Sequence, residues 1–517
     1  MSVIIRGGRV LDASAHRAEP ADVLVEGGVI REIGRPGMAA PEGAAALDAR
    51  DRLLIPGLIN AHTHAHGALV RGLAGDRVPL ELLLNQAGVL NGNRSLEDKY
   101  LSAQLSAIEM VRKGCTACYD MFVEFPAPTV DGVHAVARAY GDVGIRAVIA
   151  PMMADRTFYQ ALPGLLEAIP PPARATVEAM RATPYETSLA ACRDILKSWP
   201  FDRARVRPAL GPTIPMHCSD EFLTACRDLA REFEVGIQMH VAESRGQAVI
   251  GIRKYGKTLA AYLGDLGLLG PRFTAAHGVW LDRDDLKRLG DAGGSVAHNP
   301  PSNVRLGSGV AATRLMLESG VRVGVGTDSP SSSDTQNMFE AMRWASYLSR
   351  IATLDYRQWI TAEEAFTMAT QGSAGVLGMG DQIGRLAPGY RADIVLLDLR
   401  RPDFVPLNDA LLQLVFSEAG AAVDTVMIDG RVVLDRGRLT TVDEEKVRRA
   451  AEAAAARLRE ANAELAAAAR ALEPFVGAFC LGLTREPYPI ARVLPPDPAT
   501  NREHAKPGVP KWWARRR

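Results

Sequence analysis

The sequence has no excess of charge of either sign, because 60 Lys and Arg residues balance 60 Asp and Glu residues over 517 positions. This balance argues against a general electrostatic affinity for nucleic acid or for an anionic membrane. Cysteine is also scarce, with six residues, and Cys115 and Cys118 have no second cysteine pair or histidine nearby to complete a zinc knuckle. We therefore expect reduced, packed thiols.

We find no sequence pattern typical of a targeting signal or of a membrane-spanning segment. The N-terminus, MSVIIRGGRVLDAS, lacks an apolar core followed by a small-residue cleavage site. No later stretch reads as long and apolar enough to span a bilayer. We therefore expect a soluble, cytoplasmic protein with a small-molecule substrate, and neither nucleic acid nor membrane as a partner.

Both ends of the chain are rich in short β-strand patterns. Residues 3–35 alternate such runs with Gly-Gly turns, which is typical of hairpins, and a matching pattern returns at 392–399 and 423–434. We expect residues 1–57 and 385–440 to form one small β-sandwich module. Residues 441–517 hold an Ala-rich helix that follows Asp443 and a Pro-rich tail from Pro474. The pattern leaves open whether this helix packs on its own chain or pairs with another subunit.

Apolar strand-like runs alternate with amphipathic helical patterns, such as 96–113 and 221–234, through residues 58–384. This alternation predicts a parallel α/β domain, and eight βα units predict a (β/α)8 TIM-type barrel with its chemistry at the C-terminal strand ends. The eight expected strands are 54–60, 116–121, 146–152, 205–211, 235–240, 273–277, 294–298 and 322–327. Residues 157–187 exceed a usual βα loop and are expected to form either a lid or rim over the site or a solvated insertion.

The stretch 53–72, LLIPGLINAHTHAHGALVRG, carries the strongest chemical signal. Its apolar run reads as a buried strand that ends in His62, Thr63 and His64 before a Gly-containing turn. Because side chains alternate along a strand, His62 and His64 point to the same side. Two imidazoles aimed at one point suit a divalent transition metal, whereas a chance H-x-H in an exposed loop is the alternative.

Later strand-like runs also end in residues that bind metals or move protons. Three imidazoles and a carboxylate with room for water make a catalytic rather than a structural metal site. Such a metal lowers the pKa of its bound water towards neutrality, and a nearby carboxyl can carry protons. The residues are His240, His277, His298 and Asp328, which close the fifth to eighth runs, and Glu243, which follows His240.

This arrangement resembles the amidohydrolase superfamily. The likeness is strongest to its aminohydrolase branch, which includes methylthioadenosine/S-adenosylhomocysteine deaminases, cytosine and guanine deaminases, and triazine hydrolases. The matching stretches extend to about Leu439, and the tail beyond it has no such likeness. They are PGLINAHTHAHGALVRGLAGD, GPTIPMHCSDEFL, MHVAES, AAHGVWLD, HNPPSNVRLGSG, GVGTDSPSSSD and GRLAPGYRADIVLLDL.

The resemblance implies one zinc, or alternatively iron, per subunit. It implies that Glu243 is the proton shuttle, that His277 polarises the bound water or a substrate oxygen, and that Asp328 doubles as a base. No lysine ends the fourth expected strand, where binuclear members carry a carboxylated lysine, so we expect a mononuclear site. Relatives also imply a homodimer or larger oligomer. The implied metal ligands are His62, His64, His240 and Asp328.

Substrate contacts are less well marked. His298 and Asn303 lie in a stretch that resembles the family's seventh loop, so they are candidates to line the substrate pocket, with hydrogen bonds that hold the loop as the alternative. His217 is a third candidate. It stands where nucleoside-deaminating relatives have a different pattern, and the loop after His64 lacks their Trp, so these departures argue against a nucleoside substrate. We interpret His66 as a loop residue.

The function expected from these features is hydrolytic deamination. Hydroxide would attack an sp² carbon and release ammonia from a nitrogen heterocycle of purine, pyrimidine, pterin or triazine type. The alternative within enzymes is hydrolysis of an amide, urea, carbamate or chloro- or alkylamino-triazine bond. A non-catalytic barrel scaffold is a remote alternative, because every metal position and Glu243 are filled.

Overall fold

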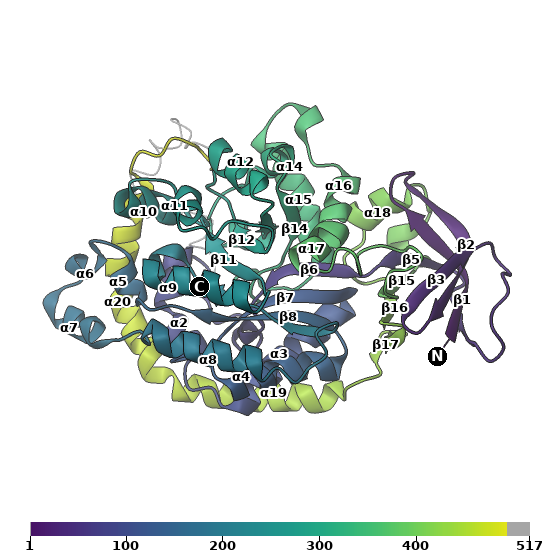
Figure 1. Cartoon of the computed structure of the whole chain (residues 1–517), viewed down its shortest axis with the longest axis horizontal. Coiled ribbons are helices and arrows are strands. Elements are labelled where there is room, and N and C mark those ends of the chain that lie inside the picture. The colour runs from purple at the N-terminus through teal and green to yellow at the C-terminus, as the bar shows by residue number, and fades with distance from the viewer. Residues whose placement is uncertain (1, 494–517) are drawn as a thin grey trace, which may run out of the picture.

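The structure is a computed structural model that describes residues 2–493. Its centre is a TIM-barrel-like α/β domain in which helices surround two parallel sheets (Figure 1). One sheet contains β6 (Leu58–Thr63), β7 (Cys115–Val123), β8 (Arg146–Met153), β9 (Val206–Pro208) and β10 (Gly211–Pro212). The other contains β11 (Ile237–Val241), β12 (Phe273–His277), β13 (Ser295–His298) and β14 (Arg322–Val325).

Two isolated parallel bridges connect these sheets around the barrel. Asp328 pairs with Thr63 at one seam, and Leu210 pairs with Ile237 at the other. Gly326 lies beside the first seam, where an added Cβ would come within 2.8 Å of the backbone of β6. A side chain does not fit in that space, so the two strands approach closely only because this residue is glycine.

The first and fourth expected strands are each divided in the structure, which corrects their bounds. The run 54–60 breaks at Gly57 into β5 (Arg52–Pro56), which belongs to the terminal sheet, and β6. A Cβ at Gly57 would lie 2.0 Å from the Thr116 hydroxyl, so the chain passes very close to β7 there. The run 205–211 gives β9 and β10, each ending in a proline that cannot donate to a strand ladder.

Strands from the N-terminal region and from residues 394–439 share one hydrogen-bonded sheet. Its order is β18-β17-β16-β15-β5-β1-β2-β3, with β4 beside β1. The antiparallel pairing of β5 with β15 joins the N-terminal and C-terminal parts. A two-layer sandwich and the three domain ranges stay predictions. The strands are β1 (Ser2–Asp12), β2 (Arg17–Glu26), β3 (Val29–Gly34), β4 (Ala45–Asp48), β15 (Ile394–Asp398), β16 (Val423–Ile428), β17 (Arg431–Asp435) and β18 (Arg438–Leu439).

Helices connect the barrel strands, and several of them begin with a residue whose side chain caps the first turn. For α3, the Ser95 side chain accepts from the Asp98 amide while Asp98 accepts from the Ser95 amide. The bounds are η1 (Ala65–Val70), α1 (Leu80–Asn85), α2 (Ala87–Asn91), α3 (Leu96–Arg112), α4 (Val130–Val143), α8 (Tyr185–Lys197), η2 (Pro215–His217), α9 (Asp220–Glu232), α10 (Arg245–Tyr255), α11 (Leu259–Asp265), α12 (Arg283–Asp291), α13 (Pro300–Arg305), α14 (Thr313–Glu318), α15 (Met338–Ala352), η3 (Tyr356–Gln358), α16 (Ala362–Thr367), η4 (Met368–Gly372), α17 (Ser373–Val376), η5 (Pro402–Phe404) and α18 (Ala410–Phe416).

The long segment 157–187 folds into three short helices and the start of α8. These helices are α5 (Phe158–Ala161), α6 (Leu165–Ala168) and α7 (Pro171–Ala179), and α7 begins with prolines because a helix tolerates them in its first turn. Phe158 and Leu162 line a small cavity together with Glu81 and His217. This position favours a rim of the site over a solvated insertion.

The Ala-rich region forms two helices rather than one. α19 (Glu444–Ala461) packs on α3, and α20 (Ala463–Thr484) packs on α1, α2, α6 and α10 of the same chain (Figure 1). α20 continues through Pro474, so the expected start of the tail at that residue is wrong. The buried stripe of Leu472, Val476, Cys480 and Leu483 explains why, since tertiary packing outweighs the missing hydrogen bond. The final residues, 494–517, lie outside the described residues.

The expectation that no stretch is long and apolar enough to cross a membrane is also wrong. By length and composition α20 qualifies, with a mean hydropathy of 1.3 in its most apolar window. Three charged residues, Glu464, Arg470 and Glu473, interrupt the first half of this helix, so its apolar residues do not form one continuous run in the sequence. Only 22% of that window is buried within the protein.

Candidate metal centre and active site

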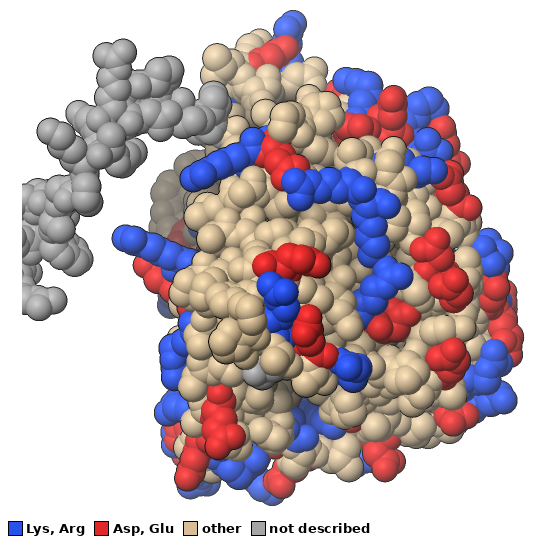
Figure 2. Space-filling model, turned by 90° about the vertical axis from the view of Figure 1, so that its left-hand side faces the viewer, with Lys and Arg blue, Asp and Glu red and all other residues tan. Residues whose placement is uncertain are grey.

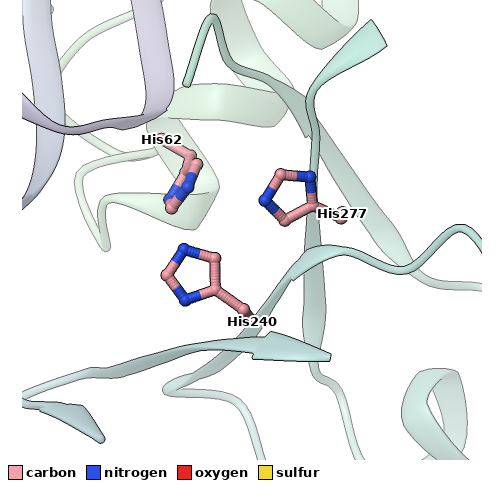
Figure 3. Close-up of side chains that lie close together, drawn as sticks. All are labelled: His62, His240 and His277. Carbon is pink, nitrogen blue, oxygen red and sulfur yellow. The ribbon is translucent and has the colours of Figure 1, made fainter. Parts of the chain in front are cut away.

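Histidines from three barrel strands converge on one point inside the barrel. Figure 3 shows His62 from β6, His240 from β11 and His277 from β12 turned towards one another. Their candidate ligand atoms all lie within 4.8 Å of each other, and the same holds for the set of His62, His64 and Asp328. The residues are buried, so water does not compete freely for these nitrogens.

Each of the four converging imidazoles uses its Nδ1 atom for a hydrogen bond to an oxygen acceptor. Because a carbonyl oxygen only accepts, Nδ1 carries the proton and Nε2 keeps its lone pair. An oxygen atom that accepts from the Nδ1–H of a metal-binding histidine fixes the orientation of its ring. The pairs are His62 with Gln238 Oε1 at 2.7 Å, His64 with Met121 O at 2.6 Å, His240 with Thr213 O at 2.8 Å and His277 with Asn303 Oδ1 at 2.9 Å.

The free Nε2 atoms form a donor set that fits a divalent metal. Nε2 of His64 and Nε2 of His240 face each other at 3.1 Å, and Nε2 of His62 is buried without a hydrogen-bond partner among the described residues. Asp328 Oδ1 lies 3.2 Å from His64 Nε2 and 3.6 Å from His62 Nε2. Two lone pairs and a carboxylate at such distances repel each other unless a cation lies between them, and imidazole with carboxylate suits zinc.

Burial keeps the imidazoles of His64, His240 and His277 neutral. It lowers the pKa of His64 to about 4, with the neighbouring His62 adding to the effect, and it lowers the pKa of His277 to about 4. Burial also brings the pKa of His240 well below its usual range. Neutral imidazole is the form that binds a metal, so the site is ready to bind one near pH 7.

Asp328 has hydrogen bonds that hold it as a carboxylate. The Ser302 hydroxyl donates to Oδ2 at 2.5 Å and the Ser329 amide donates to Oδ1 at 2.7 Å. Burial alone would raise its pKa, but the contacts with His62, His64 and His277 outweigh burial and hold the pKa well below its usual range. An ionised carboxylate is what a metal ligand requires.

Glu243 lies at the edge of the histidine and aspartate cluster, and its carboxyl group is protonated, whereas that of Asp328 is ionised. Oε2 of Glu243 is 3.7 Å from Nε2 of His277, and the side chain is almost fully buried. Burial raises the pKa of Glu243 well above its usual range, and the nearby Asp328 and Glu81 raise it further. A neutral carboxylic acid beside an ionised carboxylate is a pairing that provides an acid and a base at one site.

The backbone is strained at three points around this cluster. Residues other than glycine rarely adopt positive φ, yet φ is +70° at His277, +65° at Asp328 and +50° at Ala242, which precedes Glu243 by one residue. Strain of this kind collects at functional sites, where the surrounding structure holds it. Each of the three residues lies at or just beyond the C-terminal end of a barrel strand.

The three candidate substrate contacts lie in different surroundings. Asn303 accepts from His277, so it orients that imidazole, which favours the alternative of a structural hydrogen bond, while its Nδ2 has no partner among the described residues. His298 is buried, with Nε2 3.4 Å from the Thr313 hydroxyl and Nδ1 unpartnered within the described chain. His217 lines the small cavity that also contains Glu81.

Sequence reasoning missed the residues that hold the ligands in place. Gln238 is an example, although it lies two residues before His240 on the same strand and therefore on the same face, which was a usable signal. Ser302 and Glu81 had no such signal, because they lie on α13 and α1, two helices that only the fold brings near the site. His66, which we interpreted as a loop residue, lies in the 3-10 helix η1. It is buried, and its Nδ1 accepts from the Val123 backbone amide at 3.2 Å.

Two solved structures with a similar fold are enzymes with bound zinc. An adenosine deaminase from Xanthomonas campestris with bound zinc has a TM-score of 0.78 and 26% identity, and the match covers 89% of this chain and 98% of that one. The atrazine chlorohydrolase TrzN from Arthrobacter aurescens TC1, in complex with zinc, has a TM-score of 0.77 and 26% identity, with 88% and 100% covered.

Sequence comparison finds relatives of similar length. A 5'-deoxyadenosine deaminase of Methanothermobacter thermautotrophicus is 36% identical over 462 residues, which is 88% of this chain and 99% of the relative. A 5-methylthioadenosine/S-adenosylhomocysteine deaminase of Pyrococcus abyssi is 34% identical over 449 residues, with 86% and 97% covered. A sequence profile described as Amidohydrolase family matches residues 53–433. The chain belongs to the amidohydrolase family and is a metal-dependent hydrolase that acts on carbon–nitrogen bonds.

Proposed function

We propose that this protein is a hydrolytic deaminase that releases ammonia from an aminated nitrogen heterocycle. The observation that carries the proposal is the pairing of a neutral acid, Glu243, with an ionised carboxylate, Asp328, beside four imidazoles whose Nε2 atoms converge. Relatives that are 34% and 36% identical and bear deaminase names support the same reaction.

We propose a single zinc ion per subunit, with Fe²⁺ as the alternative. His62, His64, His240 and Asp328 would hold it, because their donor atoms lie close together and their second hydrogen-bonding atoms are already engaged. When bound, such a metal lowers the pKa of a water molecule towards neutrality and polarises the substrate. The solved neighbours that contain zinc support this choice of metal.

The chain's own residues then move the protons. The carboxylate of Asp328 accepts a proton from the attacking water, and the neutral Glu243 donates its proton to the ring nitrogen next to the carbon under attack. Nε2 of His277, which faces both carboxyl groups, orients the water or the substrate oxygen. The tetrahedral carbon collapses when the amino group takes up the proton held by Asp328, the C–N bond breaks as ammonia leaves, and the hydroxyl proton passes to Glu243, which restores both carboxyl groups.

A 6-aminopurine ring is the first substrate to test. The relatives are named for adenosine-type compounds, which supports an adenine ring as the reacting group. His217 departs from the pattern of nucleoside-deaminating relatives, and the loop after His64 lacks their Trp, so we propose a different substituent on that ring. His217, His298 and Asn303 are proposed to contact the substrate, and a homo-oligomer in the cytoplasm stays a proposal as well.

The test is ammonia release by zinc-loaded protein. The panel holds adenine, adenosine, 5'-deoxyadenosine, methylthioadenosine, guanine, cytosine, a pterin and an aminotriazine. We expect turnover of one class and a loss of at least about 100-fold in kcat for Glu243→Gln, which cannot shuttle a proton but keeps the metal. Full activity of that variant would remove Glu243 from the mechanism.

A second candidate function has an observation of its own. The atrazine chlorohydrolase that shares this fold shows that the architecture also supports loss of chloride from a triazine. A silent ammonia panel with metal-loaded protein would therefore direct the next assays to chloro- and alkylamino-triazines, amides, ureas and carbamates. Purified protein with no bound zinc or iron, and no gain of activity when either is added, would favour the scaffold alternative.

A further inference from the structure

We propose that Glu81 is a positioning residue for Glu243, a role that rests on the proposed function. Glu81 lies on α1, far from Glu243 in the sequence, and the side chain is 9% exposed. Its Oε1 accepts a hydrogen bond from the hydroxyl of Ser244 at 2.6 Å. Glu81 therefore contacts the residue that immediately follows the proposed proton shuttle.

The contacts continue from Ser244 back to the backbone of Glu243. The Ser244 hydroxyl accepts from the backbone N–H of Gln247 at 3.1 Å and so caps α10. The side-chain Oε1 of Gln247 accepts in turn from the backbone N–H of Glu243 at 3.0 Å. Ser244, Gln247 and Glu243 are all buried. These bonds form a chain from Glu81 through the first turn of α10 to the main chain of Glu243.

The loop that carries Glu243 needs such support, because its backbone is strained. Ala242 has φ of +50°, a conformation that costs free energy in a residue with a Cβ. Its carbonyl accepts from the Trp280 amide at 2.8 Å, which holds one side of the loop. The contacts from Glu81 hold the other side, and a strained loop keeps a single geometry only when it is held at both sides.

Glu81 also fits tightly against the start of α10. An added Cβ at Gly246 would lie 2.7 Å from Glu81 Oε1, so glycine at this position allows the carboxyl to reach Ser244. α1 itself is fixed, since Asn85 donates to Ala469 O on α20 at 2.9 Å and accepts from the Tyr159 hydroxyl at 2.9 Å. The support for Glu243 thus extends to the C-terminal helix and to the segment 157–187.

The first arm of the test measures kinetics. Glu81→Ala should lower kcat by about 100-fold with KM within about twofold and zinc content unchanged, because a small displacement of a catalytic group slows the reaction without weakening substrate binding. Glu81→Gln keeps an oxygen that accepts from Ser244 and should stay within about threefold of wild type. In a Glu243→Gln background, Glu81→Ala should change the residual rate by less than about twofold, because a positioning residue acts only through its target.

The second arm needs no substrate. Hydrogen exchange of the zinc-loaded full chain, read on peptides that span 241–248, should be faster in Glu81→Ala and unchanged in Glu81→Gln. Glu418→Ala is the matched control, because it removes another buried carboxyl, one that accepts from the Ala422 amide in the connection between α18 and β16. That variant should leave both kcat and the exchange of 241–248 unchanged.

Several results would overturn the proposal. A rise in KM with constant kcat would make Glu81 a substrate contact, and an equal loss in the Glu243→Gln background would make its effect independent of Glu243. Unchanged exchange at 241–248 in Glu81→Ala would show that the contacts do not hold the loop. If the wild-type protein deaminates none of the compounds in the panel, the proposed function is wrong. The hydrogen-exchange experiment still tests the role of Glu81, because it needs no substrate.

Discussion

Each imidazole of the metal centre depends on one acceptor outside the metal cluster. Gln238 illustrates this dependence, because its Oε1 accepts from His62 while its Nε2 donates to Ala61 O at 3.0 Å. The amide is thereby fixed in one orientation, and it fixes the tautomer of His62 in turn. The chemistry at the residue scale is therefore set by pairs of residues rather than by the H-x-H motif alone.

Asp328 is predicted to be required for both metal binding and rate. Asp328→Ala removes the only carboxylate in the proposed ligand set, so zinc affinity should fall by at least about 100-fold and kcat with it. The measurement is zinc content after dialysis against a chelator, together with turnover. Asp334→Ala removes a nearby carboxylate that pairs with Arg305 on the surface and should leave both quantities unchanged. Full zinc occupancy in Asp328→Ala would exclude it as a ligand.

Asp285, in the first turn of α12, is predicted to make stability depend on pH. Burial raises its pKa to about 6 from a usual value of 3.8. A carboxyl with a raised pKa binds its proton more tightly when folded, so the free energy of unfolding should decrease as pH rises from 4 to 6, by about 3 kcal/mol in total.

The measurement for Asp285 is urea unfolding at several pH values between 4 and 7. Asp285→Asn carries no titrating carboxyl and accepts similar hydrogen bonds, so its stability should change less over this interval than that of the wild type. An identical pH dependence in the two proteins would show that other groups cause it.

At the scale of elements, the loops at the C-terminal strand ends carry the chemistry and the helices around them provide support. Figure 2 shows the end of the molecule towards which these loops point, where the surface between scattered charged residues is largely uncharged. α20 crosses near this end and contacts both α1 and α10. Glu81 lies on α1, and α10 begins two residues after Glu243. The C-terminal helix therefore contributes to the geometry of the site indirectly.

The two faces of α20 are predicted to respond differently to a charge. Val476 is fully buried, so Val476→Asp should lower the free energy of unfolding by at least about 3 kcal/mol, because it buries an unpaired carboxylate. Leu481 is 58% exposed, so Leu481→Asp should change stability by less than about 0.5 kcal/mol. Thermal unfolding and size-exclusion chromatography measure both. A Leu481→Asp protein that unfolds early or dissociates would show that this face is covered in solution.

At the scale of the whole molecule, a buried arginine joins the barrel to the terminal sheet. Arg146, at the start of β8, is 2% exposed and donates to Asp393 at 2.7 Å and to Asp429 at 3.1 Å. Asp429 also pairs with Arg205 and Arg391. The two parts of the protein therefore meet through a charged network at the end of the barrel opposite the metal centre.

Arg146→Met is predicted to destabilise the protein without changing the chemistry of the folded fraction. The substitution leaves buried carboxylates without their main partner, which costs about 3–5 kcal/mol. Urea unfolding measures the loss, and kcat per folded molecule should stay unchanged. Arg193→Met breaks an exposed pair with Glu232 and should cost less than about 1 kcal/mol. Equal losses in the two variants would contradict the importance of burial.

Much of the barrel was predictable because its signal is local. Apolar runs that alternate with amphipathic helices specify βα units, and the C-terminal ends of parallel strands share one edge, so His62, His240 and Asp328 were expected to meet. The division of 54–60 at Gly57 was not predictable, because it depends on the contact with Thr116 on the next strand. The continuation of α20 through Pro474 likewise depends on what that helix packs against.

The sequence by itself determined the kinds of ligand, their positions at strand ends and the family, because these follow from residue type and periodicity along the chain. Only the tertiary structure decided which nitrogen of each imidazole is free, that Glu243 is protonated while Asp328 is ionised, and that Glu81 reaches Ser244. These properties arise from burial and from contacts between residues far apart in the chain. Contacts of this kind produce no periodic pattern of residue types in the sequence, so they are identified only from the folded structure.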